Sequence, residues 1–140
     1  MYVVDASVWV SRFISGDVHH MPSYRWLEDM VTRRELVIAP AFLLAELTGA
    51  VARRTGRSEL ATQALSLLQR LPNSRLVPVN AELAQLGANL AADLHLRGVD
   101  AIYVALARRL GIPLITWDRE QRERSSGPVA ALTPQEALAR

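Results

Sequence analysis

Short apolar runs of strand length alternate with helical patterns along the chain, and this alternation constrains the fold more than any other feature. Four such runs, and a shorter one typical of an edge strand, lie at residues 2–4, 36–39, 76–79, 113–116 and 129–132. Leucine and alanine at helical spacing fill the intervals between them. The pattern predicts a three-layer α/β/α fold with a central, mostly parallel sheet of four to five strands and right-handed connections.

Capping signals mark where some of the helices begin. Asn80 precedes leucines spaced three and four residues apart, and Thr133-Pro134-Gln135-Glu136 has the pattern of a capping box. The stretches between elements are short turns, and no internal repeat is present. With 140 residues, the sequence predicts a single domain over residues 1–140.

Composition excludes several classes of function. The chain has no Cys, so disulfide frameworks and thiol catalysis are excluded, and all sixteen basic residues are Arg. Receiver domains and haloacid-dehalogenase-like phosphatases use a lysine beside the phosphoryl group, and a P-loop needs Gly-Lys-Ser/Thr. Because the chain has no Lys, all three of these classes are excluded. A net charge of +2 does not by itself indicate a nucleic-acid partner. Without a long apolar run or a signal-peptide pattern, we expect a soluble, cytoplasmic protein and no membrane partner.

Four acidic residues fall where a parallel sheet would gather them. Asp5 ends the first predicted strand, Asp118 follows the fourth, and Asp100 lies in the first turn of the helix before the fourth. Glu46 lies about six residues past Pro40, roughly 9 Å along its helix. Ligands bind beyond the carboxyl ends of such strands, where the strand order reverses. If the first and fourth strands are neighbours, these carboxylates face one crevice.

Each acid also has a purely structural interpretation. Asp5 is a favoured helix cap, Asp100 suits a helix start, and Asp118 suits a turn. Glu46 could pair with an arginine at 53–54. These interpretations do not predict that the four acids meet. Carboxylates that converge raise one another's pKa unless a cation neutralises them, and oxygen ligands favour Mg²⁺ or Mn²⁺. The chemistry that follows is metal-assisted phosphodiester hydrolysis with one or two ions.

The segments that carry these acids resemble the PIN domain, and more narrowly the VapC-type ribonuclease toxins of bacterial toxin–antitoxin pairs. The resemblance covers essentially the whole chain in the same order. Its most specific part is Gly-x-Asp-Ala-x-Tyr-x-Ala-x-Ala, which begins at Gly98. The other matching parts are Val4-Asp5-Ala6-Ser7, Glu46 in a helix after the second strand, and Leu114-Ile115-Thr116-Trp117-Asp118.

The resemblance implies a PIN-like fold and an endoribonuclease that depends on Mg²⁺ or Mn²⁺. It implies that the metal-binding and catalytic acids are Asp5, Glu46, Asp100 and Asp118, with Ser7 and Thr116 as supporting hydroxyls. Transfer, ribosomal and messenger RNA are all compatible substrates. It also implies a homodimer and a cognate VapB-like antitoxin that occupies the active-site groove and inhibits the enzyme.

One alternative function remains compatible with the sequence. A non-catalytic PIN-fold module for RNA binding or protein interaction would share the fold, but such a module would typically have lost one of the acids. The chain departs from its relatives after Asp118, where Arg119-Glu120-Gln121-Arg122 replaces an apolar residue that is common there. The arginines of this segment are candidate phosphate contacts or a solvated helix face, and Trp117 is a candidate for base stacking or for packing.

Overall fold

Five parallel strands form the central sheet of the computed structural model, which describes residues 1–140. The strands are β1 (Tyr2–Val4), β2 (Val37–Pro40), β3 (Ser74–Val77), β4 (Leu114–Ile115) and β5 (Ala131–Leu132). Their order across the sheet is β3-β2-β1-β4-β5, and each neighbouring pair is parallel. The predicted fold class is confirmed, and β5 is an edge strand as expected.

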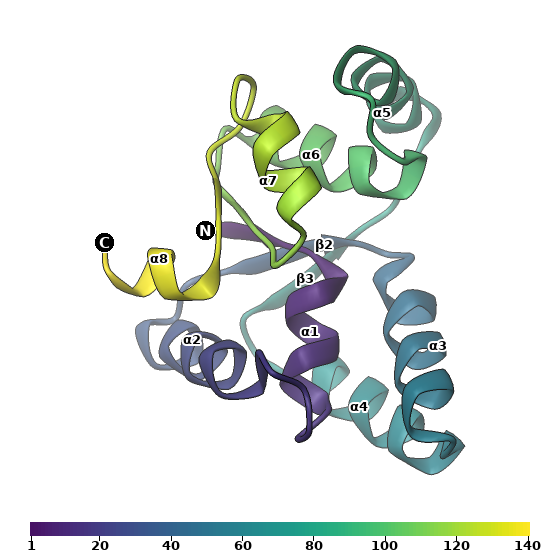
Figure 1. The fold of residues 1–140 in the computed structure, drawn as a ribbon, viewed down its shortest axis with the longest axis vertical. Coiled ribbons are helices and arrows are strands. Elements are labelled where there is room, and N and C mark those ends of the chain that lie inside the picture. The colour runs from purple at the N-terminus through teal and green to yellow at the C-terminus, as the bar shows by residue number, and fades with distance from the viewer.

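Helices cover both faces of this sheet, so the molecule has three layers. Figure 1 shows α5, α6 and α7 on one side of the strands and α1, α2, α3 and α4 on the other. The bounds of the helices are α1 (Ala6–Phe13), α2 (His20–Arg33), α3 (Leu43–Thr55), α4 (Ser58–Arg70), α5 (Ala81–Leu94), α6 (Gly98–Leu110), α7 (Arg119–Ser125) and α8 (Pro134–Leu138).

The central strands are apolar throughout because both of their faces are covered. Val3 and Val4 in β1, and Leu114 and Ile115 in β4, have no exposed surface. A parallel sheet between two helical layers requires such continuous apolar runs rather than an alternating pattern. The hydrophobic core therefore lies on both sides of β1 and β4, and the polar residues that follow these two strands lie at its edge.

The strand order reverses between β1 and β4. Val3 pairs with Leu114 and Val4 pairs with Ile115, so the two strands are direct neighbours. From β1 the chain builds β2 and β3 on one side, and it then places β4 and β5 on the other side. The strands that precede Asp5 and Asp118 are therefore neighbours, as the sequence-based prediction of a shared crevice required.

Two elements differ from the sequence-based expectation. The third strand covers Ser74–Val77 rather than 76–79, and Val79 is partly exposed. Helix α2 had no recognisable start signal, since its N-cap residue His19 makes no side-chain capping bond. None of the helices is long and apolar enough to cross a membrane.

Candidate active site

Asp5 connects the end of β1 to the start of α1. Its Oδ2 accepts hydrogen bonds from the backbone N of Ser7 at 2.9 Å and from the Thr116 hydroxyl at 3.2 Å. The side chain is therefore the N-cap of α1, as the structural interpretation proposed. The cap uses one carboxylate oxygen, and Oδ1 has no hydrogen-bond donor. Capping and ligand binding are therefore compatible in this residue.

Two hydroxyl groups tie the ends of β1 and β4 together. The Ser7 Oγ lies 3.3 Å from the Thr116 Oγ1 and accepts a hydrogen bond from the backbone N of Trp117 at 3.0 Å. The Thr116 Oγ1 accepts the backbone N–H of Asp118 at 3.0 Å. Thr116 is fully buried. These bonds fix the loop after β4 relative to Asp5.

Asp100 and Asp118 lie on either side of one arginine. The Arg97 Nε is 2.9 Å from the Asp100 Oδ2, and its Nη2 is 3.4 Å from the Asp118 Oδ2. Asp118 also caps α7 by accepting the backbone N–H of Gln121 through Oδ1 at 3.0 Å. Arg97 therefore neutralises two of the predicted acids, which sequence reasoning did not anticipate.

Glu46 is held by a tyrosine from the opposite layer rather than by an arginine. It lies in the first turn of α3, and its Oε1 accepts a hydrogen bond from the Tyr103 hydroxyl at 2.7 Å. Tyr103 is fully buried in α6. The salt bridge to Arg53 or Arg54 is absent, because Arg54 pairs with Asp17 at 2.7 Å and Arg53 forms no ion pair.

The spacing between Asp100 and Tyr103 in the sequence was a partial indication of this contact. Tyr103 follows Asp100 by three residues, so both side chains project from one face of α6 toward the same edge of the sheet. The contact also needed the crossing of α6 over the sheet, which the sequence pattern does not specify.

Three of the acids, Asp5, Glu46 and Asp100, have raised pKa values, and neighbouring acids contribute to each shift. Burial raises the pKa of Asp5, and the negative charge of Asp100 adds to this, against the hydrogen bonds from Ser7 and Thr116. Burial also raises the pKa of Glu46, with further contributions from Asp5 and Asp100. The pKa of Asp100 is raised by burial and then by Asp118, although Arg97 opposes the shift. The four carboxylates therefore share one electrostatic environment.

The chemistry of this donor set fits a hard divalent cation. All candidate ligands are carboxylate oxygens, and Asp5, Glu46 and Asp100 each keep one oxygen without a hydrogen-bond donor, which leaves lone pairs for a ligand role. No three Asp, Glu or His side chains lie close enough together in this structure to hold a metal ion. Arg97, whose side chain is 74% exposed, supplies the positive charge between Asp100 and Asp118.

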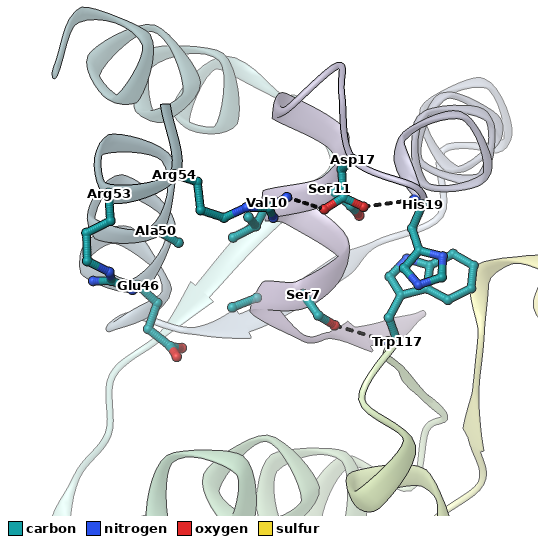
Figure 2. A pocket seen from close by; sticks show the side chains of 11 residues that line it. Ser7, Val10, Ser11, Asp17, His19, Glu46, Ala50, Arg53, Arg54 and Trp117 are labelled. Atoms are coloured by element: carbon teal, nitrogen blue, oxygen red, sulfur yellow. Dashed lines mark hydrogen bonds and ion pairs between the residues drawn. The ribbon is translucent and has the colours of Figure 1, made fainter. Parts of the chain in front are cut away.

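A cavity of about 480 Å³ adjoins the acids on the side of α1 and α3. Figure 2 shows Glu46 and two arginines of α3 on one wall, and His19 and Trp117 on the other. The His19 and Trp117 rings are stacked, with centroids 3.9 Å apart and planes at 5°. His19 was not identified from the sequence. The lining residues are Ala6, Ser7, Val10, Ser11, Asp17, His19, Glu46, Ala50, Arg53, Arg54 and Trp117.

The arginines after Asp118 fit the solvated-face interpretation. Arg119 pairs with Glu123 at 2.7 Å, and Arg124 pairs with Glu120, each within α7. These side chains are exposed, and their charge is partly satisfied along the helix.

Comparison with known proteins gives one family and several structural relatives. The PIN domain family model matches residues 2–126. A search of curated proteins finds no matching relative. VapC20 of Mycobacterium tuberculosis, described as a Sarcin-Ricin loop cleaving toxin, has 22% identity and a TM-score of 0.77, and the match covers 92% of this chain and 97% of that one.

Two further structural relatives are toxin–antitoxin complexes. VapBC2 of Rickettsia felis, bound to a DNA fragment of its promoter, has 16% identity and a TM-score of 0.71 over 93% of this chain and 96% of that one. A complex from Klebsiella pneumoniae has 19% identity and a TM-score of 0.69 over 96% and 98%. At these identities the likeness establishes a shared fold.

Proposed function

Because the chain belongs to the PIN domain family, we propose that it is a VapC-like endoribonuclease that hydrolyses RNA phosphodiester bonds and depends on Mg²⁺ or Mn²⁺. The observation that carries this proposal is that carboxylates from four separate segments lie at one edge of the sheet, where Asp5, Glu46 and Asp100 influence one another electrostatically and Arg97 pairs with both Asp100 and Asp118. Neither the stability of the sheet nor helix capping requires that these groups meet.

The free oxygens of Asp5, Glu46 and Asp100, together with Asp118, are the groups that would hold the ion. A bound divalent ion would lower the pKa of a water nucleophile and neutralise charge that develops on the phosphate. Ser7 and Thr116 orient Asp5 and the loop that carries Asp118. They are positioning residues in this scheme, because the structure shows them bonded to the acids and to the backbone.

The charge balance of the site follows from the surroundings of the acids. Without a cation, burial and mutual repulsion favour protonated carboxyl groups, as the raised pKa values of Asp5 and Glu46 show. A bound divalent cation would reverse this preference, because it would stabilise the ionised carboxylate oxygens of Asp5 and Glu46. The arrangement is therefore suited to a cation rather than to an isolated general base.

We further propose a cognate VapB-like antitoxin that inhibits the enzyme, and a homodimeric toxin. Support comes from the relatives, since the structures from Rickettsia felis and Klebsiella pneumoniae are toxin–antitoxin complexes. The Sarcin-Ricin loop cleavage named for VapC20 supports RNA as the substrate class. An antitoxin in the groove beside Glu46 would block access to the acids.

Cleavage of RNA in the presence of Mn²⁺ tests the proposed activity. The wild-type chain should cut, and the Asp5→Asn variant should be slower by on the order of a thousandfold, because one cation ligand is lost. Asn is also a good N-cap, so the variant should keep α1. The exposed Asp93 provides a matched control, and Asp93→Asn should cut like the wild type. Equal cleavage by wild type and Asp5→Asn would defeat the assignment.

Metal removal gives an independent check on the same assay. EDTA should abolish cleavage, and added Mn²⁺ should restore it, because carboxylates without a cation do not activate water at neutral pH. Chelator-resistant cleavage would indicate a different mechanism. If the wild type binds RNA but never cuts it, the chain is instead a non-catalytic PIN-fold binding module.

A further inference from the structure

The cavity beside the acids has two walls that the proposed hydrolysis does not use. Ser7 and Glu46 lie where the cavity meets the acidic site, and the remaining lining residues lead away from it along α1 and α3. Figure 2 shows a wall of aromatic rings facing a wall of arginines, with α1 between them. A volume of about 480 Å³ lies within the ~300–1,000 Å³ typical of small-molecule sites.

The aromatic wall is rigid. His19 stacks on Trp117, and the indole Nε1 of Trp117 donates a hydrogen bond to the Ser23 Oγ at 2.8 Å. Ser23 is fully buried and lies 2.6 Å from the Ser11 Oγ. The backbone of Trp117 is fixed as well, by its bond to Ser7. Because these side chains are already held in place, a planar group that stacks on them would pay little entropy for ordering side chains.

The opposite, cationic wall is formed by Arg53 and Arg54, and one of these two arginines has no ion-pair partner. Arg54 is engaged with Asp17 at 2.7 Å, whereas Arg53 is exposed and forms no ion pair. The Arg53 Nη1 lies 3.2 Å from where a Cβ on Gly49 would be, so the guanidinium lies back along α3 in the direction of Glu46. The glycine leaves room for this conformation.

A flat aromatic surface opposite a free guanidinium matches a nucleotide better than a peptide. A base stacks on aromatic rings, and a phosphate pairs with Arg. Only four of the eleven lining residues are hydrophobic, which disfavours an apolar peptide segment. We propose that the cavity is a nucleotide subsite in which an RNA base stacks on the His19 and Trp117 rings and a neighbouring phosphate binds Arg53. This subsite rests on the proposed ribonuclease function and names how its substrate is held.

The aromatic wall is tested with RNA that contains 2-aminopurine, whose fluorescence falls when the base stacks. The full chain with Asp5→Asn should bind a single-stranded RNA of mixed sequence without cutting it. One position of the 2-aminopurine should be quenched on binding. His19→Ala in this background should weaken binding about tenfold and remove that quenching, whereas His19→Phe should keep both.

The cationic wall is tested by the salt dependence of the same binding. Arg53→Ala should weaken binding and reduce the slope of log affinity against log salt by about 0.7, the value for one phosphate contact on a single strand. Arg108 supplies the matched control, because it is exposed near the end of α6, away from the acids. Arg108→Ala removes the same charge and should leave the slope unchanged. Unaltered thermal melting of each variant excludes loss of the fold.

The outcomes separate this inference from the function on which it rests. If wild type cuts RNA with Mn²⁺, but His19→Ala and Arg53→Ala bind RNA like Arg108→Ala, the subsite is wrong and the ribonuclease assignment stands. If wild type neither cuts nor binds RNA, the proposed function itself fails. If the variants keep RNA affinity but lose a co-purifying protein partner, the cavity is a protein interface and the subsite is again overturned.

Discussion

At the scale of single residues, helix capping by an acid is compatible with the proposed ligand role, although sequence reasoning treated the two as alternatives. Asp5 caps α1 through Oδ2, and Asp118 caps α7 through Oδ1. A carboxylate has two oxygens, so capping through one of them leaves the other available for a different contact. The groups that hold the acids were less predictable. Tyr103 and Arg97 act across elements, and their contacts depend on helix crossings that local sequence patterns do not encode.

The hydrogen bond from Tyr103 predicts a change in metal affinity. Tyr103→Phe should lower Mn²⁺ affinity by about tenfold, because Glu46 loses the donor that orients it. It should also cost about 1 kcal/mol of unfolding free energy, since a half-buried carboxylate oxygen loses its partner. Calorimetric titration and chemical denaturation measure the two effects. Tyr24→Phe, at a partly exposed position, is the control, and an unchanged Mn²⁺ affinity in Tyr103→Phe would refute the orienting role.

The ion pair of Asp17 predicts a pH-dependent stability. Burial alone would raise the pKa of Asp17, but the bonds from the His19 backbone and Arg54 lower it below its ordinary value. A lowered folded-state pKa stabilises the protein above the unfolded-state pKa, and this stabilisation is lost as the pH falls through the folded-state value. Asp17→Asn should therefore cost about 0.5 to 1 kcal/mol at neutral pH.

That cost should shrink on acidification. The difference in unfolding free energy between wild type and Asp17→Asn, measured by denaturant titration, should decline below about pH 4, where the unfolded-state Asp becomes protonated. Asn keeps an acceptor for the His19 N–H, so the substitution isolates the charge. A difference that stays constant from neutral to acidic pH would show that the pair with Arg54 contributes nothing.

At the scale of elements, periodicity and caps located most helices, and the errors have local causes. The capping box at Thr133 and the Asn80 cap are present as expected. The third strand was displaced because apolarity alone marked it, whereas its ladder with β2 begins at the polar Ser74 and ends at Val77. Helix α2 was missed because nothing caps its start. Which helix packs on which was not predictable, since it depends on small residues at contact points.

Gly87 is such a contact point between α5 and α6. A Cβ at this position would come within 2.4 Å of the Ile102 Cδ1, so the glycine allows the two helices to approach. Gly87→Leu should destabilise the protein by about 1 to 3 kcal/mol through overpacking, although leucine favours helix more than glycine does. Ala88→Leu on the exposed face of the same helix should change the unfolding free energy by less than about 0.5 kcal/mol. Equal denaturation midpoints for both variants would contradict this packing.

At the scale of the whole molecule, the site is a consequence of topology. The strand order reverses between β1 and β4, and the residues after these strands meet at their carboxyl ends. Rules for parallel sheets were sufficient to predict this meeting from the order of segments along the chain. They were not sufficient to predict the cavity beside it, because that depends on the loop that brings His19 over Trp117.

The central proposal is that the carboxylates of Asp5, Glu46, Asp100 and Asp118 together bind a divalent cation, and a calorimetric titration with Mn²⁺ tests it most directly. The wild-type chain should bind the ion. Asp5→Asn and Asp100→Asn should each weaken binding by at least about tenfold, because each removes a charged ligand. Glu123→Gln, an exposed acid paired with Arg119, should bind like wild type. Mn²⁺ affinity that is the same in wild type, Asp5→Asn and Asp100→Asn would contradict the account.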